Sequence, residues 1–314
     1  MTYILITPVK NEAAVLKQAF ACILGQTVLP AIWVLVDGGS SDGTLEQIRE
    51  LQERHAWIYL KQQEAFSARQ GHLNFAFGVW EGYEYARQIA RERGIEYDYV
   101  GKTDADVLLP GDFFASLIRR LEEDAGIGVA SGASYTLRPG APLPSPDAIG
   151  EARFDRDYFL PYEMPDKRVY RRTALEQIGG FPVTTFAPDS VALAKLLTSG
   201  WRVVSFGDVG IYNLRKDTSI EKDRWKSSLL LGYESYYLGC HPLYVLISGM
   251  YHLTSPSQYN GFGLMIGYAS AIVHREEKID DRGVRRYYRI TRFAKLNRVV
   301  ATEVRRTLSR FLGS

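Results

Sequence analysis

The sequence predicts an α/β fold, with a mostly parallel central sheet that is flanked by helices. Three observations support this class. In the first hundred residues, short apolar runs alternate with longer stretches that have helical spacing. The apolar runs are continuous, as in parallel strands that are covered on both faces. Polar segments rich in glycine and aspartate follow several of these runs, at the strand ends where open α/β sheets bind ligands.

Four strands and three helices are expected in this first part of the chain. The expected strands are residues 3–7, 31–36, 57–60 and 97–102, and the expected helices are residues 12–23, 44–53 and 73–92. The second strand, AIWVLV, contains no charged residue, which favours a fully buried strand. The first helix has apolar residues at Val15, Ala19 and Ile23, the spacing of one helical face.

The composition is that of a globular protein with a sizeable core. The chain has 314 residues, of which 46% are hydrophobic and 24% charged. Its 38 Lys and Arg nearly balance 36 Asp and Glu, a net charge of +2, which does not favour a nucleic-acid binder. Cys22 and Cys240 are too few for a disulfide framework, and no CxxC pair suggests zinc. The N-terminus lacks the pattern of a signal peptide, so we expect a cytoplasmic protein.

The last third of the chain differs from the rest, and we expect two domains, residues 1–222 and 223–314. Residues 235–273 contain no Lys, Arg, Asp or Glu. Two apolar blocks in this run, 242–253 and 261–273, favour helices. Each block is shorter than the ~20 residues that a helix needs to span a bilayer.

A basic segment follows the charge-free run. Residues 274–314 hold 12 Lys and Arg and 5 Asp and Glu, a net charge of +7, and apolar residues recur within it at roughly helical spacing. An amphipathic basic tail suits an anionic membrane surface. We therefore expect a helical, membrane-associated region that lies peripherally on the inner face of the cell membrane. Core helices with a solvated basic face, or a homodimer interface, are the alternatives, and no base-stacking motif accompanies the tail to suggest nucleic acid.

Two polar segments follow the first two expected strands. In TPVKNE the proline stops the strand and turns the chain. In VDGGSSDGT the glycines permit a close approach of the backbone to a ligand. Asp37, at the strand end, could accept hydrogen bonds from a base or a ribose hydroxyl. The alternative is a plain turn in which Asp42 or Thr44 caps the next helix.

Two further segments carry carboxylates. Asp104 and Asp106 follow the fourth expected strand. If the strand continues or turns gently here, they share one face and converge on a divalent cation. Oxygen ligands suit Mg²⁺ or Mn²⁺, and a substrate diphosphate would complete the shell. Asp189 is a candidate general base for an acceptor hydroxyl, with a helix N-cap for residues 191–197 as the alternative.

Taken together, these segments resemble glycosyltransferase family 2, the inverting nucleotide-sugar enzymes with a GT-A fold. The resemblance runs from Thr7 to Arg215, through TPVKNE, VDGGSSDGT, RQGHLN, DAD and the stretch from Arg171 to Phe181. It implies a donor, a UDP or GDP sugar, and a Mn²⁺ or Mg²⁺ ion held by Asp106 and Asp104. The residues that it implies on the donor side are Pro8, Lys10, Glu12, Asp37, Arg69, Asp104 and Arg215. On the acceptor side it implies Arg171, Arg172 and Gly180.

The sequence departs from the family pattern at two places. The family usually has Glu-Asp where this chain has Pro188-Asp189, and many members have His-x-Arg where this chain has Asn213-Leu214-Arg215. The second carboxylate is kept, so the resemblance implies Asp189 as the catalytic base. An amide is a weaker metal ligand than an imidazole, so Asn213 is not expected to bind metal.

The reaction that the resemblance implies is a single displacement with inversion at the anomeric carbon. The acceptor is a hydroxyl or a phosphate, on a lipid-linked sugar or on a precursor of a surface polysaccharide. A non-catalytic sugar-nucleotide-binding module is the first alternative. A nucleotidyltransferase is the second, although TPVKNE lacks the glycines of a phosphate loop.

Overall fold

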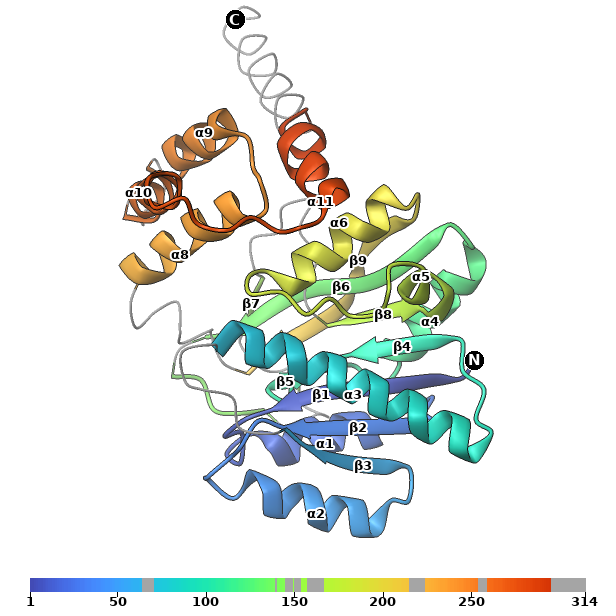
Figure 1. Cartoon of the computed structure of the whole chain (residues 1–314). Coiled ribbons are helices and arrows are strands. Elements are labelled where there is room, and N and C mark those ends of the chain that lie inside the picture. The colour runs from blue at the N-terminus through green and yellow to red at the C-terminus, as the bar shows by residue number, and fades with distance from the viewer. Residues whose placement is uncertain are drawn as a thin grey trace, which may run out of the picture. The chain divides into compact units, whose positions relative to one another are not determined.

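The chain forms two compact units, Met1–Lys216 and Asp217–Ser314. Their structure is a computed structural model. It describes residues 1–63, 71–138, 140–144, 149, 154–156, 167–214, 224–253 and 259–294 (Figure 1). The predicted domain boundary between residues 222 and 223 lies outside the described residues and stays a prediction.

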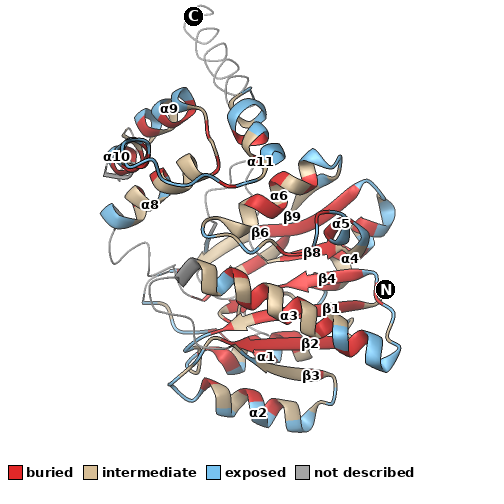
Figure 2. Ribbon diagram, in the orientation of Figure 1, coloured by how far each residue is buried: buried red, intermediate tan, exposed pale blue. Residues whose placement is uncertain are grey.

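The first half of the sheet is parallel. It consists of β1 (Tyr3–Val9), β2 (Ile32–Asp37), β3 (Ile58–Gln62) and β4 (Tyr99–Lys102), in the order β3-β2-β1-β4. All three pairings in this half are parallel. The central strands are buried along almost their whole length (Figure 2), because helices cover both faces. The α/β class and its predicted parallel half are confirmed.

Alternate residues of β1 divide the core into two layers. Tyr3 and Leu5 pack on one face of the sheet with helices α1, α2 and α4. Ile4 and Ile6 pack on the other face with helices α3, α5 and α6. The bounds of these helices are α1 Leu16–Leu24, α2 Thr44–Arg54, α3 Gly71–Arg93, α4 Phe113–Glu123, α5 Arg172–Gln177 and α6 Pro188–Thr198.

One helix begins later than predicted. The expected start of the first helix was residue 12, and α1 begins at Leu16. Asn11 has a positive φ of 55°, and Val15 lies outside helical geometry with φ −120° and ψ −10°. The chain therefore turns twice before it can form a regular helix.

The second half of the sheet mixes strand directions. The order continues from β4 through β8, β6 and β9 to β5, and β7 pairs with β6. The bounds are β5 Val107–Leu108, β6 Ile127–Leu137, β7 Phe154–Arg156, β8 Arg168–Arg171 and β9 Arg202–Asn213. Strand β8 runs antiparallel to both β4 and β6. Its first residue, Arg168, therefore lies beside Lys102, the last residue of β4.

The second unit is helical in its described residues. It contains α8 (Arg224–Tyr237), α9 (Pro242–Leu253), α10 (Tyr259–Val273), α11 (Arg282–Arg286) and the π-helix η3 (Tyr287–Thr291). The two apolar blocks of the sequence form α9 and most of α10, as predicted. None of the helices in the described ranges combines the length and the hydropathy needed to cross a bilayer.

We predict that a methyl group at Gly82 destabilises the first unit. This glycine lies in α3, where an added Cβ would be 2.6 Å from Val36 Cγ2 and 2.9 Å from Ile6 Cγ2. Overpacking of ~2 kcal/mol exceeds the ~1 kcal/mol that alanine gains in helix propensity. Gly82→Ala should therefore lower the free energy of unfolding in equilibrium denaturation.

Gly78→Ala is the matched control in the same helix. The nearest atoms to its added Cβ belong to the end of the Gln63 side chain, at 3.3 Å, which can shift. This variant should be as stable as the wild type or more so. If both variants were equally stable, the close packing of α3 on the sheet would be wrong.

Candidate functional site

Two loops at the carboxyl edge of the parallel strands bind one another. They are the predicted donor segments, after β1 and after β2. The backbone N–H of Asn11 donates to Ser40 Oγ at 3.0 Å, and Asn11 Oδ1 accepts from the backbone N–H of Ser41 at 2.9 Å. The backbone N–H of Glu12 donates to Thr44 Oγ1 at 2.8 Å. The loops therefore form one surface, which also carries the exposed Lys10, while Pro8 is half-buried within β1.

Asp37 shapes the second loop. Its side chain is buried, and its carboxylate accepts hydrogen bonds from the backbone N–H groups of Gly39, at 3.2 Å, and Ser40, at 3.2 and 3.3 Å. Asp42 accepts from the backbone N–H and the hydroxyl of Thr44 at the start of α2. This hydroxyl bond is the main reason that the pKa of Asp42 lies below its ordinary value. The N-cap residue of α2 is Gly43, without a side-chain cap, so neither Asp42 nor Thr44 is the N-cap residue. The nucleoside contact of Asp37 stays a prediction.

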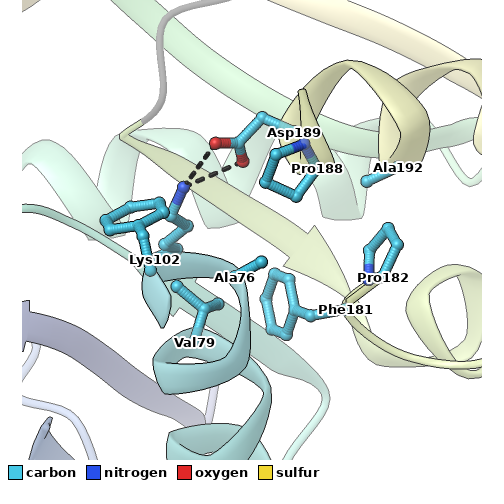
Figure 3. A pocket seen from close by; sticks show the side chains of 9 residues that line it. Ala76, Val79, Lys102, Phe181, Pro182, Pro188, Asp189 and Ala192 are labelled. Carbon is cyan, nitrogen blue, oxygen red and sulfur yellow. Dashed lines mark hydrogen bonds and ion pairs between the residues drawn. The ribbon is translucent and has the colours of Figure 1, made fainter. Parts of the chain in front are cut away.

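The central feature of the site is a carboxylate held by two buried cations. Asp189 Oδ1 and Oδ2 lie 2.8 and 2.9 Å from Lys102 Nζ, and Oδ1 lies 2.9 Å from Arg168 Nη1 (Figure 3 shows the lysine contacts). The Lys102 and Arg168 side chains are 1% and 2% exposed, and that of Asp189 is 22% exposed. Burial favours the protonated acid, but the two cations outweigh it and lower the pKa of Asp189. The carboxylate is therefore ionised at neutral pH.

The backbone before α6 brings Asp189 to this position. Ala187 has a left-handed conformation, φ 46° and ψ 50°, and Pro188 occupies the first helical turn, where a proline needs no hydrogen-bond partner. Asp189 makes no side-chain cap to its own helix. Its oxygens bind the cations of β4 and β8 instead, so the helix N-cap alternative is wrong.

Asp104 is a second ionised carboxylate. Its Oδ2 lies 2.6 Å from Lys167 Nζ. Burial raises the pKa of Asp104, but Lys167 and then Lys102 outweigh burial and lower it below the ordinary value. Residues 103–106 form a connection with a turn between β4 and β5. Asp104 and Asp106 therefore do not share a face of a strand, which was one reason to pair them at a cation.

The described residues show no metal centre made from protein ligands alone. No group of three or more His, Cys, Asp or Glu side chains gathers to hold a metal within the described residues. Asn213, at the end of β9, donates from Nδ2 to Ser134 Oγ at 2.7 Å and to the carbonyl of Tyr135 at 3.2 Å. Any ion bound by Asp104 and Asp106 would need further ligands.

An apolar pocket adjoins the Lys102–Asp189 ion pair (Figure 3). Residues of α3, α6 and the segment after α5 line it: Phe75, Ala76, Val79, Phe181, Pro182, Pro188 and Ala192. Gly180 precedes Phe181 with a φ of +84°, which a residue with a side chain rarely adopts. The ring of Phe181 then packs edge-on against Tyr83 and Tyr170, at 5.4 and 5.2 Å between ring centroids. The pocket therefore presents apolar walls and one ionised carboxylate.

The structure does not bring Arg171 and Arg172 to this pocket, which corrects their predicted place. Strand β8 is antiparallel to β4, so Arg171 pairs with Tyr99 at the opposite edge of the sheet. Its guanidinium donates to the backbone carbonyls of Ile127, Leu121 and Asp124. Arg172 forms ion pairs with Glu176 at 2.8 Å and Glu96 at 3.5 Å. Of the predicted acceptor-side residues, Gly180 alone lies next to a pocket residue.

The sequence prediction missed the pairing of Asp189 with Lys102 and Arg168. A lysine between a buried strand and two aspartates needs a counter-charge, because a fully buried lysine is rare without one. That signal could have identified Lys102. Nothing local in the sequence identifies Arg168 as its neighbour. Arg69 and Arg215, predicted on the donor side, lie outside the described residues.

Comparison with known families shows the family of this chain. A model for glycosyl transferase family 2 matches residues 4–179, more than half of the chain. The chain belongs to glycosyl transferase family 2. The predicted family is confirmed, and so is the prediction of a glycosyltransferase at that general level. No curated protein matches the chain in sequence.

Solved structures resemble this family 2 chain in fold. The mannosyltransferase PcManGT from Pyrobaculum calidifontis, in complex with GDP-Man and Mn²⁺, is 19% identical, with a TM-score of 0.53 over 86% of this chain and 75% of that one. S. aureus TarS 1–349 is 19% identical, with a TM-score of 0.50 over 75% of this chain and 65% of that one. TarS 1–349 with UDP is 14% identical, with a TM-score of 0.50 over 89% and 95%. The shared fold confirms the predicted GT-A class.

We predict that Asp189→Asn lowers the free energy of unfolding by about 3 kcal/mol, because it leaves two buried cations without their counter-charge. In the double variant Asp189→Asn/Lys102→Met, the loss in free energy of unfolding should be smaller than the sum of the two single losses by more than ~1 kcal/mol.

Since the folded-state pKa of Asp189 is lowered, the stabilisation that this carboxylate provides is present above the ordinary carboxyl pKa. It is lost as pH falls through the folded-state value.

Asp155→Asn is the control for this cycle. Asp155 makes an ion pair with Arg138 in which both side chains are more than half exposed, and its loss should change stability by less than ~0.5 kcal/mol. Chemical denaturation of the four variants and the wild type measures all the terms. Strict additivity of Lys102→Met and Asp189→Asn would contradict the coupling of the two side chains.

Proposed function

We propose that this protein is an inverting, metal-dependent glycosyltransferase. It moves a sugar from a nucleotide-diphosphate sugar to a hydroxyl or phosphate acceptor, on a lipid-linked molecule or a surface-glycan precursor. The observation that carries the proposal is the ionised Asp189 at an apolar pocket, held by cations at the carboxyl end of β4 and the amino end of β8.

The donor loops support the first half of this proposal. The segments after β1 and β2 lie at the carboxyl edge of the sheet, where open α/β sheets bind ligands. The backbone N–H groups of Gly39 and Ser40 donate to Asp37 within the second loop, and Asn11 of the first loop donates to Ser40 Oγ. Because PcManGT binds GDP-Man and TarS binds UDP in similar folds, we assign the same edge here to a UDP or GDP sugar.

Asp189 is the proposed base for a hydroxyl acceptor. The acceptor oxygen bonds to the anomeric carbon as the bond from that carbon to the diphosphate breaks, and the electron pair leaves on the nucleoside diphosphate. The acceptor proton passes to Asp189. Because Lys102 and Arg168 lower its pKa, this carboxylate is a weak base. It would accept the proton late, when the new bond has made the acceptor oxygen acidic.

Asp104 and Asp106 fit a divalent cation by the chemistry of their oxygens, and Asp104 is ionised. They are the residues that would hold Mn²⁺ or Mg²⁺, with the donor diphosphate as a further ligand. Asp104 would then share its carboxylate between the ion and Lys167. The ion would supply positive charge to the leaving diphosphate.

We predict that one nucleotide among UDP, GDP, CDP and dTDP raises the melting temperature of the protein, and that the increase requires Mn²⁺ or Mg²⁺. Binding to the folded state stabilises it by mass action. Asp106→Ala should abolish the metal-dependent part of the shift. Asp98→Ala is the matched control, an exposed carboxylate next to the start of β4, at the other end of that strand. A thermal-shift panel measures all three proteins.

The outcomes of this panel are distinct. A metal-dependent shift that Asp106→Ala removes supports the donor site and identifies the nucleobase of the donor. No shift with any nucleotide would contradict the donor site. An equal shift in Asp106→Ala would place the metal elsewhere.

We further predict that Asp189→Asn reduces transfer of the sugar from the identified donor by about 10²–10⁴-fold, the range for loss of a general base. Hydrolysis of the donor sugar, in which water replaces the acceptor, is the assay. The melting-temperature shift with the nucleotide should persist, which separates lost chemistry from lost binding. Unchanged hydrolysis would assign the base to another residue. Nucleotide binding without turnover in the wild type would favour the sugar-nucleotide-binding module.

A further inference from the structure

Two helices of the second unit present apolar faces to solvent. In α9 the exposed side chains recur at i, i+3 and i+7, and in α10 at i, i+4 and i+11, so each set lies along one side of its helix. They are Leu243, Leu246 and Met250 in α9, at 51, 46 and 58% exposure, and Phe262, Ile266 and Val273 in α10, at 51, 49 and 77%. No charged residue interrupts either set.

The packing inside the unit uses other positions of the same helices. In α10, Gly263 and Gly267 face α8, where an added Cβ would lie 2.3 Å from Ser228 Cβ and 2.1 Å from the carbonyl oxygen of Leu229. Gly249 of α9 lies against Gly261 of α10. The helices therefore meet backbone to backbone through glycines. The large side chains of Leu246 and Ile266 remain about half exposed.

We propose that these faces of α9 and α10, together with the arginines that follow, bind the surface of an anionic lipid bilayer. Exposed apolar side chains that are grouped rather than scattered mark an interaction site. Residues 282–294 contain five arginines and no Asp or Glu, and Arg282, Arg286 and Arg289 are exposed. The guanidinium of Arg292 lies over the ring of Tyr244 in α9, 5.1 Å from its centroid, so the arginine-rich segment adjoins this helix. An apolar helix face and an adjoining arginine-rich segment match the two layers of a membrane surface, acyl chains below and anionic headgroups above.

The charge favours a membrane over a second copy of the chain. In a symmetric dimer the same patch meets itself, which would bring two copies of residues 282–294 together, each with five arginines and no Asp or Glu. Anionic headgroups would neutralise that charge instead. The helices have 12 and 15 residues, and thus lengths of ~18 and ~22 Å, less than the ~30 Å hydrocarbon core. They lie in the surface of the bilayer and do not cross it.

Membrane binding of this kind is independent of the proposed reaction, because it needs neither a donor nor turnover. It would bring the enzyme to acceptors that are anchored in lipid. The probe is a vesicle of phosphatidylcholine and phosphatidylglycerol at 3:1, compared with a vesicle of phosphatidylcholine alone. The full chain is sedimented with each.

The wild type should sediment with the anionic vesicles and much less with the neutral ones. Leu246→Asn combined with Ile266→Asn should weaken binding by at least about tenfold, since each buried Leu or Ile contributes ~1.5–3 kcal/mol. Arg286→Gln with Arg289→Gln should weaken binding to anionic vesicles and reduce its dependence on salt. Leu29→Asn, at a residue of the first unit that is 45% exposed, is the matched control and should bind as the wild type does.

Three results would overturn the proposal. The first is no sedimentation with either vesicle, and the second is equal binding of the wild type and the Leu246→Asn/Ile266→Asn variant. The third is a dimer in light scattering that this double variant dissociates, without vesicle binding, which would assign the faces to a second copy. Melting temperatures of the variants, which substitute exposed side chains, check that each is folded.

Discussion

Lys102 and Arg168 are buried cations, and neither would be stable in the interior without a shared negative charge. Asp189 supplies it, and in doing so ties three elements together: the end of β4, the start of β8 and the first turn of α6. The left-handed Ala187 immediately precedes this contact, and the apolar pocket adjoins it. The same charge that the fold requires is the one that we assign to the chemistry.

Because Asp189 neutralises two buried cations and is also the proposed general base, its basicity is limited. A carboxylate with two cationic neighbours stays ionised and fixed in orientation, but it attracts a proton weakly. Its partner in the usual family pattern is replaced by Pro188. Here the cations of the sheet, and not a neighbouring glutamate, hold Asp189 in place. Positioning is thus achieved through long-range pairing between strands instead of through adjacent residues in the chain.

The parallel half of the fold was predictable because its information is local. AIWVLV has no residue that could face water, and β2 is buried throughout. The hydrogen bonds of Thr44 to Asp42 are also local, since the two residues are two positions apart in the chain. The contact of Asp189 with Arg168 was not, since it depends on the antiparallel direction of β8, which a four-residue strand does not reveal. For the same reason, Arg171 and Arg172 were predicted on the acceptor side, and the structure places Arg171 at the other end of β4 from the pocket. The late start of α1 depends on the positive φ of Asn11, which no apolar periodicity encodes.

The two loops that we propose to bind the donor are joined by hydrogen bonds in the absence of a ligand, through Asn11, Ser40, Ser41 and Thr44. A nucleotide that meets them does not have to order them, so little conformational entropy is lost on binding. That loss has already occurred during folding. At the proposed donor site, affinity for the donor and local stability of this edge would then depend on the same few hydrogen bonds. Warming that loosens the loops would weaken donor binding while the sheet beneath is still intact.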